Sequence, residues 1–350
     1  MRDPRSLDAY LRQVLPDIDK GLSDSGNAPY ERPMFAAIFI VNHLIKEVQG
    51  GTKDSYFEQP WFAALYRSVE GWFCKKYGGK LMKAPNSDAI GAVEFQGLLL
   101  PIRVLLVLPK PSEDGTLWLT FAKEVLPGEN PLNWLESAPP LDRVSSKRRS
   151  ALAAECELVA NQLRGIQNDL LTAGAEWPRP DVLRASVLHH LSKAATDAAS
   201  GEREVLSLAI WELQMACEKT MKGYFAQRGV TFPETHNLRA LHKIAAIDAT
   251  WSEAKAALAG FPSEARVIRL RYSEDPPPSS TEFMLIYRSA LTICRFYAGR
   301  MSRKYEFNNF AIQLRRPPWL GEVPESANVA QKTGGVHPIP IGLQPTSASN

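Results

Sequence analysis

One stripe of apolar residues constrains the fold of this chain more than any other feature. It begins after a run of three prolines, at Ser279 and Glu282, which have the spacing of a helix-capping box. Apolar residues then recur every three or four positions: Phe283, Tyr287, Ala290, Cys294, Tyr297 and Met301. This period predicts an amphipathic helix that buries one face against the rest of the protein.

The other side of this predicted helix carries positive charge. On a helical wheel, Arg288, Arg295 and Arg303 lie opposite the apolar stripe. No acidic residue occurs between Glu282 and Glu306. We therefore expect an exposed basic face, which is either only solvated or in contact with the phosphate groups of a ligand. In the second case, Arg288 and Arg295 are candidate binding residues.

Residues 181–305 contain helical patterns throughout. The widest apolar surface lies on residues 202–228 and is typical of a central helix that packs on several sides. Three shorter helical patterns complete the region: 181–199, 236–247 and 263–272. About five helices with short connections predict an all-α, up-and-down helical bundle.

Residues 1–175 mix helical and strand-like periods and predict an α+β domain of unknown function. Helices are expected at three places: 34–48, 61–77 and 146–171. Residues 89–109, bent at Gly97, and residues 116–125 are rich in β-branched and aliphatic side chains. They predict a three-stranded antiparallel meander. Residues 317–350 are rich in Pro, Gly and Ser, and we expect a disordered tail there.

The composition of the chain narrows its class. Its 350 residues are 45% hydrophobic and 23% charged, which is typical of a globular protein. The net charge of +3 is too small to indicate a polyanion partner, so any nucleic-acid binding must depend on local basic patches. The four cysteines are far apart and contain no Cys-x-x-Cys pair, so we expect reduced thiols. We predict no metal ion, no cofactor and no membrane association, and we expect a cytoplasmic protein.

Four short motifs occur in order within the helical region. They are LSKAATDAA at 191–199, the Glu218–Lys222 stretch of MACEKTMKGYFAQRG, the turn Thr235–Leu238, and the sequence Arg271–Glu274 before the last helix. In this order and spacing, the motifs resemble those of the HEPN domain, over about a third of the chain. Residues 1–175 resemble no family that we know.

The resemblance implies a helical bundle that forms homodimers and binds RNA or a nucleotide. It also implies a place in a prokaryotic toxin–antitoxin or defence system, with a partner protein encoded nearby. Two other hypotheses remain open. The chain is a metal-independent ribonuclease of the HEPN type, or it is a structural scaffold that pairs two chains.

A HEPN-type ribonuclease would use an arginine followed by a histidine, the first for a phosphate and the second for proton transfer. At the matching place before the last helix, this sequence has Arg271 where the resemblance would require histidine. An arginine cannot act as a base at neutral pH. The spacing is met only by Arg184 and His189, on the first helix of the bundle, and these are the catalytic candidates.

Glu218 and Lys222 are four residues apart in the order that favours an ion pair on a helix. The simpler interpretation is a surface ion pair with little effect on stability. In the alternative, both residues line a polar groove between helices that holds a phosphate-bearing ligand. The other predicted members of this groove are His236, Arg269, Arg271 and Tyr272.

Overall fold

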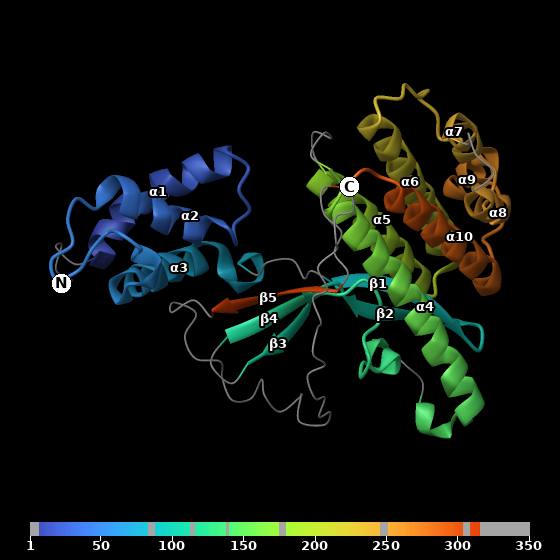
Figure 1. Ribbon diagram of the computed structural model, residues 1–350, viewed down its shortest axis with the longest axis horizontal. Coiled ribbons are helices and arrows are strands. Elements are labelled where there is room, and N and C mark those ends of the chain that lie inside the picture. Colours follow the sequence, from blue (N-terminus) through green and yellow to red (C-terminus); the bar gives the residue numbers. More distant parts are fainter. Residues whose placement is uncertain are drawn as a thin grey trace, which may run out of the picture. The chain divides into compact units, whose positions relative to one another are not determined.

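The computed structural model describes residues 7–82, 88–112, 116–137, 140–174, 180–245, 251–303 and 309–315. The chain divides into two compact units (Figure 1). One is built mainly from residues 1–86 and the other from residues 87–112 and 117–313. The units therefore divide near residue 86, whereas the sequence analysis placed the boundary between residues 175 and 181. The predicted tail at 317–350 lies outside the described residues.

The first unit contains helices α1 (Leu7–Asp24), α2 (Arg32–Phe39) and α3 (Pro60–Leu81). A π-helical turn, Ile40–Leu44, continues α2, and a short 3₁₀ helix, Tyr56–Glu58, precedes α3. The helices expected at 34–48 and 61–77 are present with different ends. The sequence analysis missed α1, although Leu11, Leu15, Ile18 and Leu22 recur at helical spacing; Pro16 in its interior disfavours a helix there.

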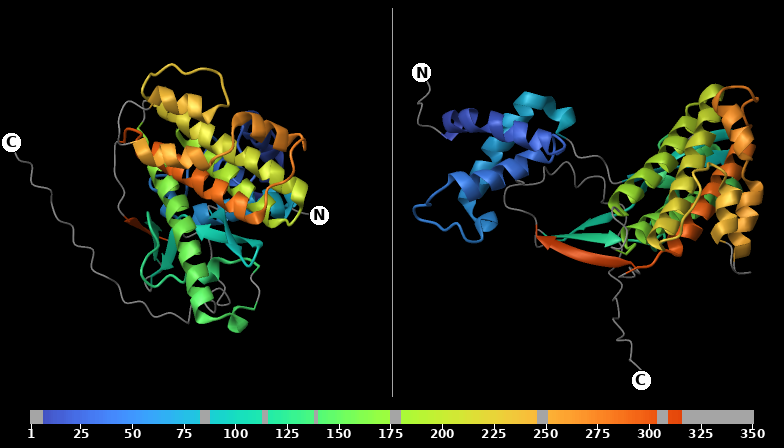
Figure 2. Two further views of the ribbon diagram at one scale, coloured as in Figure 1. Left: turned by 90° about the vertical axis from the view of Figure 1, so that its right-hand side faces the viewer. Right: turned by 90° about the horizontal axis from the view of Figure 1, so that it is seen from above.

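The second unit is a helical bundle packed on a β-hairpin. Its long helices are α4 (Ser146–Leu171), α5 (Pro180–Ala199), α6 (Arg203–Gln227) and α10 (Ser280–Gly299). Shorter helices lie against α6 and α10 (Figures 1 and 2): α7 (Leu238–Ala245), α8 (Ser252–Gly260) and α9 (Glu264–Arg271). The expected helical character of this region is confirmed, with α8 as an additional helix.

The hairpin consists of β1 (Asp88–Phe95) and β2 (Leu98–Leu105), which pair antiparallel. Gln96 and Gly97 form its two-residue turn, and both have positive φ, as a tight hairpin turn requires. β1 packs against α4, α5 and α10. One hydrophobic core therefore joins the hairpin, α4 and the C-terminal helices, which explains why the chain does not divide at residue 175.

The predicted three-stranded meander is wrong. The chain bends after β2, and β3 (Leu108–Pro111) pairs with β4 (Thr116–Phe121) in a second sheet. The third strand of that sheet, β5 (Phe310–Arg315), comes from the other end of the chain, so the strand order is β3–β4–β5. A continuous apolar run conceals the bend between β2 and β3, and local sequence carries no signal for the pairing with β5.

Arg164 on α4 fixes the segment that follows β4. Its side chain is fully buried and forms two hydrogen bonds of 2.7 Å with the Glu129 carboxylate. It also donates to the backbone oxygens of Leu105 and Glu124, at 3.0 and 3.1 Å. Two short 3₁₀ helices, Pro131–Trp134 and Leu141–Arg143, follow in this segment. One side chain thereby joins α4, the end of β2 and the connection between β4 and α4.

Candidate functional site

Glu218 of α6 is the centre of the first polar cluster. Its side chain is only 8% exposed, and its carboxylate accepts a hydrogen bond of 2.7 Å from Lys222 Nζ. The second carboxylate oxygen lies 2.7 Å from His236 Nδ1. Because an ionised carboxylate only accepts, Nδ1 of the imidazole must carry the proton. The predicted ion pair of Glu218 and Lys222 is present. Because the Glu218 carboxylate is buried, the pair is not the simple surface pair of the first interpretation.

Trp211 extends this cluster toward α9. Its ring centroid lies 5.6 Å from that of His236, and the Arg271 guanidinium lies 4.1 Å above the same ring. Because Trp211, Glu218 and Lys222 are seven and four residues apart, they share one side of α6. Sequence reasoning missed Trp211, although this spacing to Glu218 is a usable signal.

Of the remaining two residues of the predicted groove, Tyr272 lies beside the cluster and Arg269 does not. Tyr272 is 65% exposed, and its ring lies 5.7 Å from the Arg271 guanidinium, so it borders the cluster. Arg269 instead pairs with Asp275 at 2.9 Å. The structure therefore brings together five of the six predicted groove residues and turns Arg269 to another partner.

A second polar cluster joins α5 to α6. Lys219 Nζ lies 2.6 Å from Ser186 Oγ and 2.8 Å from His190 Nε2, and His190 Nδ1 lies 2.6 Å from the Glu212 carboxylate. All four side chains are partly buried. The sequence analysis missed this cluster. Its signal is the pair of helical spacings, four residues from Ser186 to His190 and seven from Glu212 to Lys219.

The two clusters occupy neighbouring sides of α6. Glu212 and Lys219 are one residue beyond Trp211 and Glu218, so they are rotated by about 100° around the helix. The first cluster faces His236 and α9, and the second faces α5. We call the two clusters together, with the strip of α6 between them, the α6 polar surface. Its members are Ser186, His190, Trp211, Glu212, Glu218, Lys219, Lys222, His236 and Arg271.

The structure does not bring Arg184 and His189 together. Arg184 Nη1 donates to the side-chain oxygen of Gln167 on α4, at 3.1 Å. His189 is exposed, and its ring contacts that of His190 at 5.9 Å between centroids. Five residues apart on a helix, the two side chains point in directions about 140° apart. Their spacing matches the ribonuclease motif, but their placement does not form a shared site.

The predicted exposed basic face of α10 is wrong. Arg288 pairs with Glu155 at 2.6 Å, and Arg295 forms an ion pair with Asp169, both acids from α4. Arg303 lies beyond the end of α10 and also pairs with Asp169, at 3.0 Å. A helical wheel shows no acids near these arginines because the acids come from another helix. Arg288 and Arg295 thus connect α10 to α4.

Gly165 permits the contact between α4 and Arg295. A Cβ atom at this position would overlap the Arg295 guanidinium. The arginine therefore lies directly across the backbone of α4 on its way to Asp169. This close approach requires a residue without a side chain.

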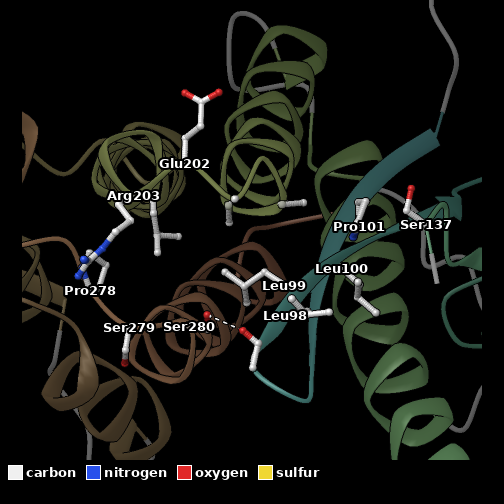
Figure 3. Close-up of a pocket in the computed structure, with 15 residues that line it drawn as sticks. Leu98, Leu99, Leu100, Pro101, Ser137, Glu202, Arg203, Pro278, Ser279 and Ser280 are labelled. Atoms are coloured by element: carbon white, nitrogen blue, oxygen red, sulfur yellow. Dashed lines mark hydrogen bonds between the residues drawn. The ribbon is translucent and has the colours of Figure 1, made fainter. Parts of the chain in front are cut away.

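A pocket of about 650 Å³ lies elsewhere in the second unit. Figure 3 shows Leu98 and Leu99 of β2 beside Ser280, whose hydroxyl donates to the Gly97 oxygen at 3.0 Å. Glu202 and Arg203, at the start of α6, also line it. The pocket contains none of the predicted catalytic or binding residues, and its lining is largely apolar near the hairpin.

Comparisons with protein-family models, curated proteins and solved structures find no significant match. Within the described residues, no three His, Cys, Asp or Glu side chains are grouped as a metal site would need. No described helix combines the length and the hydropathy needed to cross a membrane. Of the four cysteines, Cys74 is exposed and the others are buried in α4, α6 and α10, all as free thiols.

Proposed function

We propose that the C-terminal helices form a HEPN-like bundle and that its α6 polar surface binds single-stranded RNA or a nucleotide. The observation that supports this most is the arrangement of Arg271 and His236 around the Trp211 ring, beside Lys222. Aromatic rings stack on bases, and guanidinium and ammonium groups contact phosphates. The Glu218 carboxylate accepts hydrogen bonds from both Lys222 and His236 and thereby fixes their positions.

The imidazole of His236 is suited to contact a ligand. Its side chain is 50% exposed, and its Nδ1 proton is directed to Glu218. Among the described residues, Nε2 has no hydrogen-bond partner. The ring is therefore held in one orientation with its second nitrogen available.

The test measures the affinity of the full chain for a fluorescent single-stranded RNA as a function of salt. We expect Arg271→Ala to weaken binding about tenfold and to reduce the salt slope by about one. Arg269→Ala is the matched control, since it removes the same charge from the same helix but from a residue directed at Asp275. Equal losses in both variants would contradict the assignment of this surface.

Absence of RNA binding at low salt would favour the scaffold hypothesis.

In our proposal, the protein is cytoplasmic, forms a homodimer through the bundle and functions with a partner protein encoded nearby in a toxin–antitoxin or defence system. Sedimentation velocity of the purified chain tests the dimer. A monomer at all accessible concentrations would exclude both the dimer and the scaffold.

A second candidate function is a metal-independent ribonuclease, favoured by the chain of contacts Glu212–His190–Lys219–Ser186. A carboxylate that orients an imidazole is suitable for proton transfer near a phosphate, provided that the phosphate draws the Lys219 ammonium away from His190 Nε2. In this version His190 replaces His189 as the catalytic histidine. RNA degradation in EDTA should be lost in His190→Ala and kept in His189→Ala. Degradation that survives both substitutions, or none in the unmodified protein, would reject this candidate.

A further inference from the structure

The first unit contains a groove that is separate from the α6 polar surface. It lies between α1 and α3 and has a volume of about 290 Å³. Leu11 and Arg12 line it from α1, and Arg67, Gly71, Trp72 and Lys75 line it from α3. The groove thus combines three positive charges with apolar and aromatic surface.

The positive charges of the groove are not neutralised within it. Arg12 donates to a backbone oxygen, that of Asp8, at 3.2 Å. Arg67 and Lys75 are exposed, and neither forms a hydrogen bond or an ion pair with another residue in the described part of the chain. The Asp8 carboxylate also lines the groove and forms no ion pair with described residues. Two net positive charges remain, and they attract an anion.

This concentration of charge is not a consequence of the composition of the unit. Residues 7–82 contain nine Lys and Arg and nine Asp and Glu. Elsewhere in the unit, Arg32 and Lys76 both pair with the buried Asp19. Arg32 and Lys76 are therefore neutralised in the core, whereas Arg12, Arg67 and Lys75 form no ion pair with the described residues.

Gly71 leaves the centre of the groove open. Arg67, Gly71 and Lys75 follow one another at intervals of four residues, so they lie on one side of α3. A Cβ atom at Gly71 would meet no other atom within 4 Å. Any longer side chain there would extend between the two cations and occupy the space that a ligand would use.

We propose that this groove binds a small organic phosphate, with its phosphate groups between Arg12, Arg67 and Lys75. Two guanidinium groups can each donate two parallel hydrogen bonds to phosphate oxygens, and the lysine adds a third positive charge. Trp72, which is partly exposed, contacts the apolar part of the ligand. This proposal concerns a different unit from the α6 polar surface and does not depend on the function proposed there.

Isothermal titration calorimetry of the full chain at low salt tests the proposal, with ATP and pyrophosphate as probes and adenosine as the phosphate-free comparison. All titrations use the Arg271→Ala background, in which the α6 polar surface is expected to bind about tenfold more weakly, and the groove variants below separate the remaining contribution of that surface. We expect ATP to bind at least about tenfold more tightly than adenosine, because the charged groups contribute most of the affinity.

Two pairs of variants locate the site. Gly71→Glu should abolish the binding of ATP, since it fills the groove and adds a negative charge, whereas Gly71→Ala should retain it. Lys75→Gln should weaken binding about tenfold, whereas the same change at Lys80, beyond the break of α3 at Gly78, should have no effect. Circular dichroism confirms that each variant is folded.

Three results would overturn the proposal. The first is no binding of either ATP or pyrophosphate by the folded chain. The second is equal affinity for ATP and adenosine. The third is ATP binding that is unchanged in both Gly71→Glu and Lys75→Gln. Loss of RNA binding in Arg271→Ala has no bearing on these outcomes, so the two proposals can fail separately.

Discussion

Asp19 lies at the centre of a polar cluster in the core of the first unit. Its carboxylate lies 3.1 Å from Arg32 Nη1, 2.5 Å from Lys76 Nζ and 2.6 Å from the Tyr77 hydroxyl. Burial alone would raise the pKa of Asp19, but the hydrogen bonds from Lys76, Tyr77 and Arg32 outweigh it and hold the pKa below its usual value. The ionised form is therefore the one that stabilises the fold.

A lowered pKa in the folded state makes the contribution of Asp19 depend on pH. It is fully present above the pKa of the unfolded chain, near 4, and is lost as the pH falls through the lower folded value. We expect Asp19→Asn to destabilise the first unit by about 3 kcal/mol at pH 7. The difference from the unmodified protein should shrink below pH 4. Urea unfolding from pH 7 to pH 2 measures it, and a difference that stays constant would contradict the assigned charge.

At the scale of the elements, the Arg164 side chain connects α4 to the end of β2 and to the segment that follows β4. The buried Arg164 contacts Glu129 and two backbone oxygens, and its guanidinium lies 5.5 Å from the centre of the Trp134 ring. We expect Arg164→Met to lower the free energy of unfolding of the second unit by about 3–5 kcal/mol, because Glu129 loses its partner. Urea unfolding provides the measurement.

Two further variants separate charge from packing. Adding Glu129→Gln to Arg164→Met should recover part of the loss, since no partly buried carboxylate then lacks a positive partner. Arg103 also pairs with a glutamate, Glu136, at 2.7 Å, but its side chain is 42% exposed. Arg103→Met should therefore cost less than about 1 kcal/mol. A cost equal to that of Arg164→Met would show that burial does not determine the effect.

The elements that sequence reasoning predicted correctly are those with a long apolar period. The predicted helix at 202–228 corresponds to α6, and that at 146–171 to α4, because each buries a broad face. Ser279 caps α10 as predicted and accepts from the Glu282 backbone amide at 3.1 Å. The partners of Arg295 and the pairing of β5 could not be predicted, since both depend on residues more than 120 positions away.

The candidate site shows the same limit. The spacing of Glu218 and Lys222 was sufficient to predict their pairing, because both lie on one helix. The contacts of Lys219 with Ser186 and His190 join two helices. Helical spacing groups the residues within each helix, but it does not show that the two faces meet. Spacing alone predicts contacts within a helix, whereas the contacts between α5 and α6 depend on how the two helices pack.

At the scale of the whole molecule, the chain has two separate hydrophobic cores. Phe73 of α3 is fully buried in the first, and Leu213 of α6 is fully buried in the second. We expect two transitions in differential scanning calorimetry. Phe73→Ala should reduce the free energy of unfolding of the first unit by about 3–5 kcal/mol. The transition of this unit then moves to a lower temperature, and the transition of the second unit stays unchanged.

Leu213→Ala should have the reverse effect, with a loss of about 2–5 kcal/mol in the second unit. The two variants are controls for each other, because each removes a fully buried apolar side chain. A single transition that shifts by the same amount in both variants would show that the cores unfold together.

The crossing of Arg295 over Gly165 has a consequence for the descent of this protein. A methyl group or any larger substituent at position 165 would displace the Arg295 guanidinium. A short side chain at position 295 would instead leave the backbone of α4 at Gly165 uncovered. In related chains the two positions should therefore covary. A glycine at position 165 should occur with a long side chain at position 295, and a larger residue at 165 with a short one at 295. A set of homologues in which they vary independently would mean that α4 and α10 meet differently across the lineage.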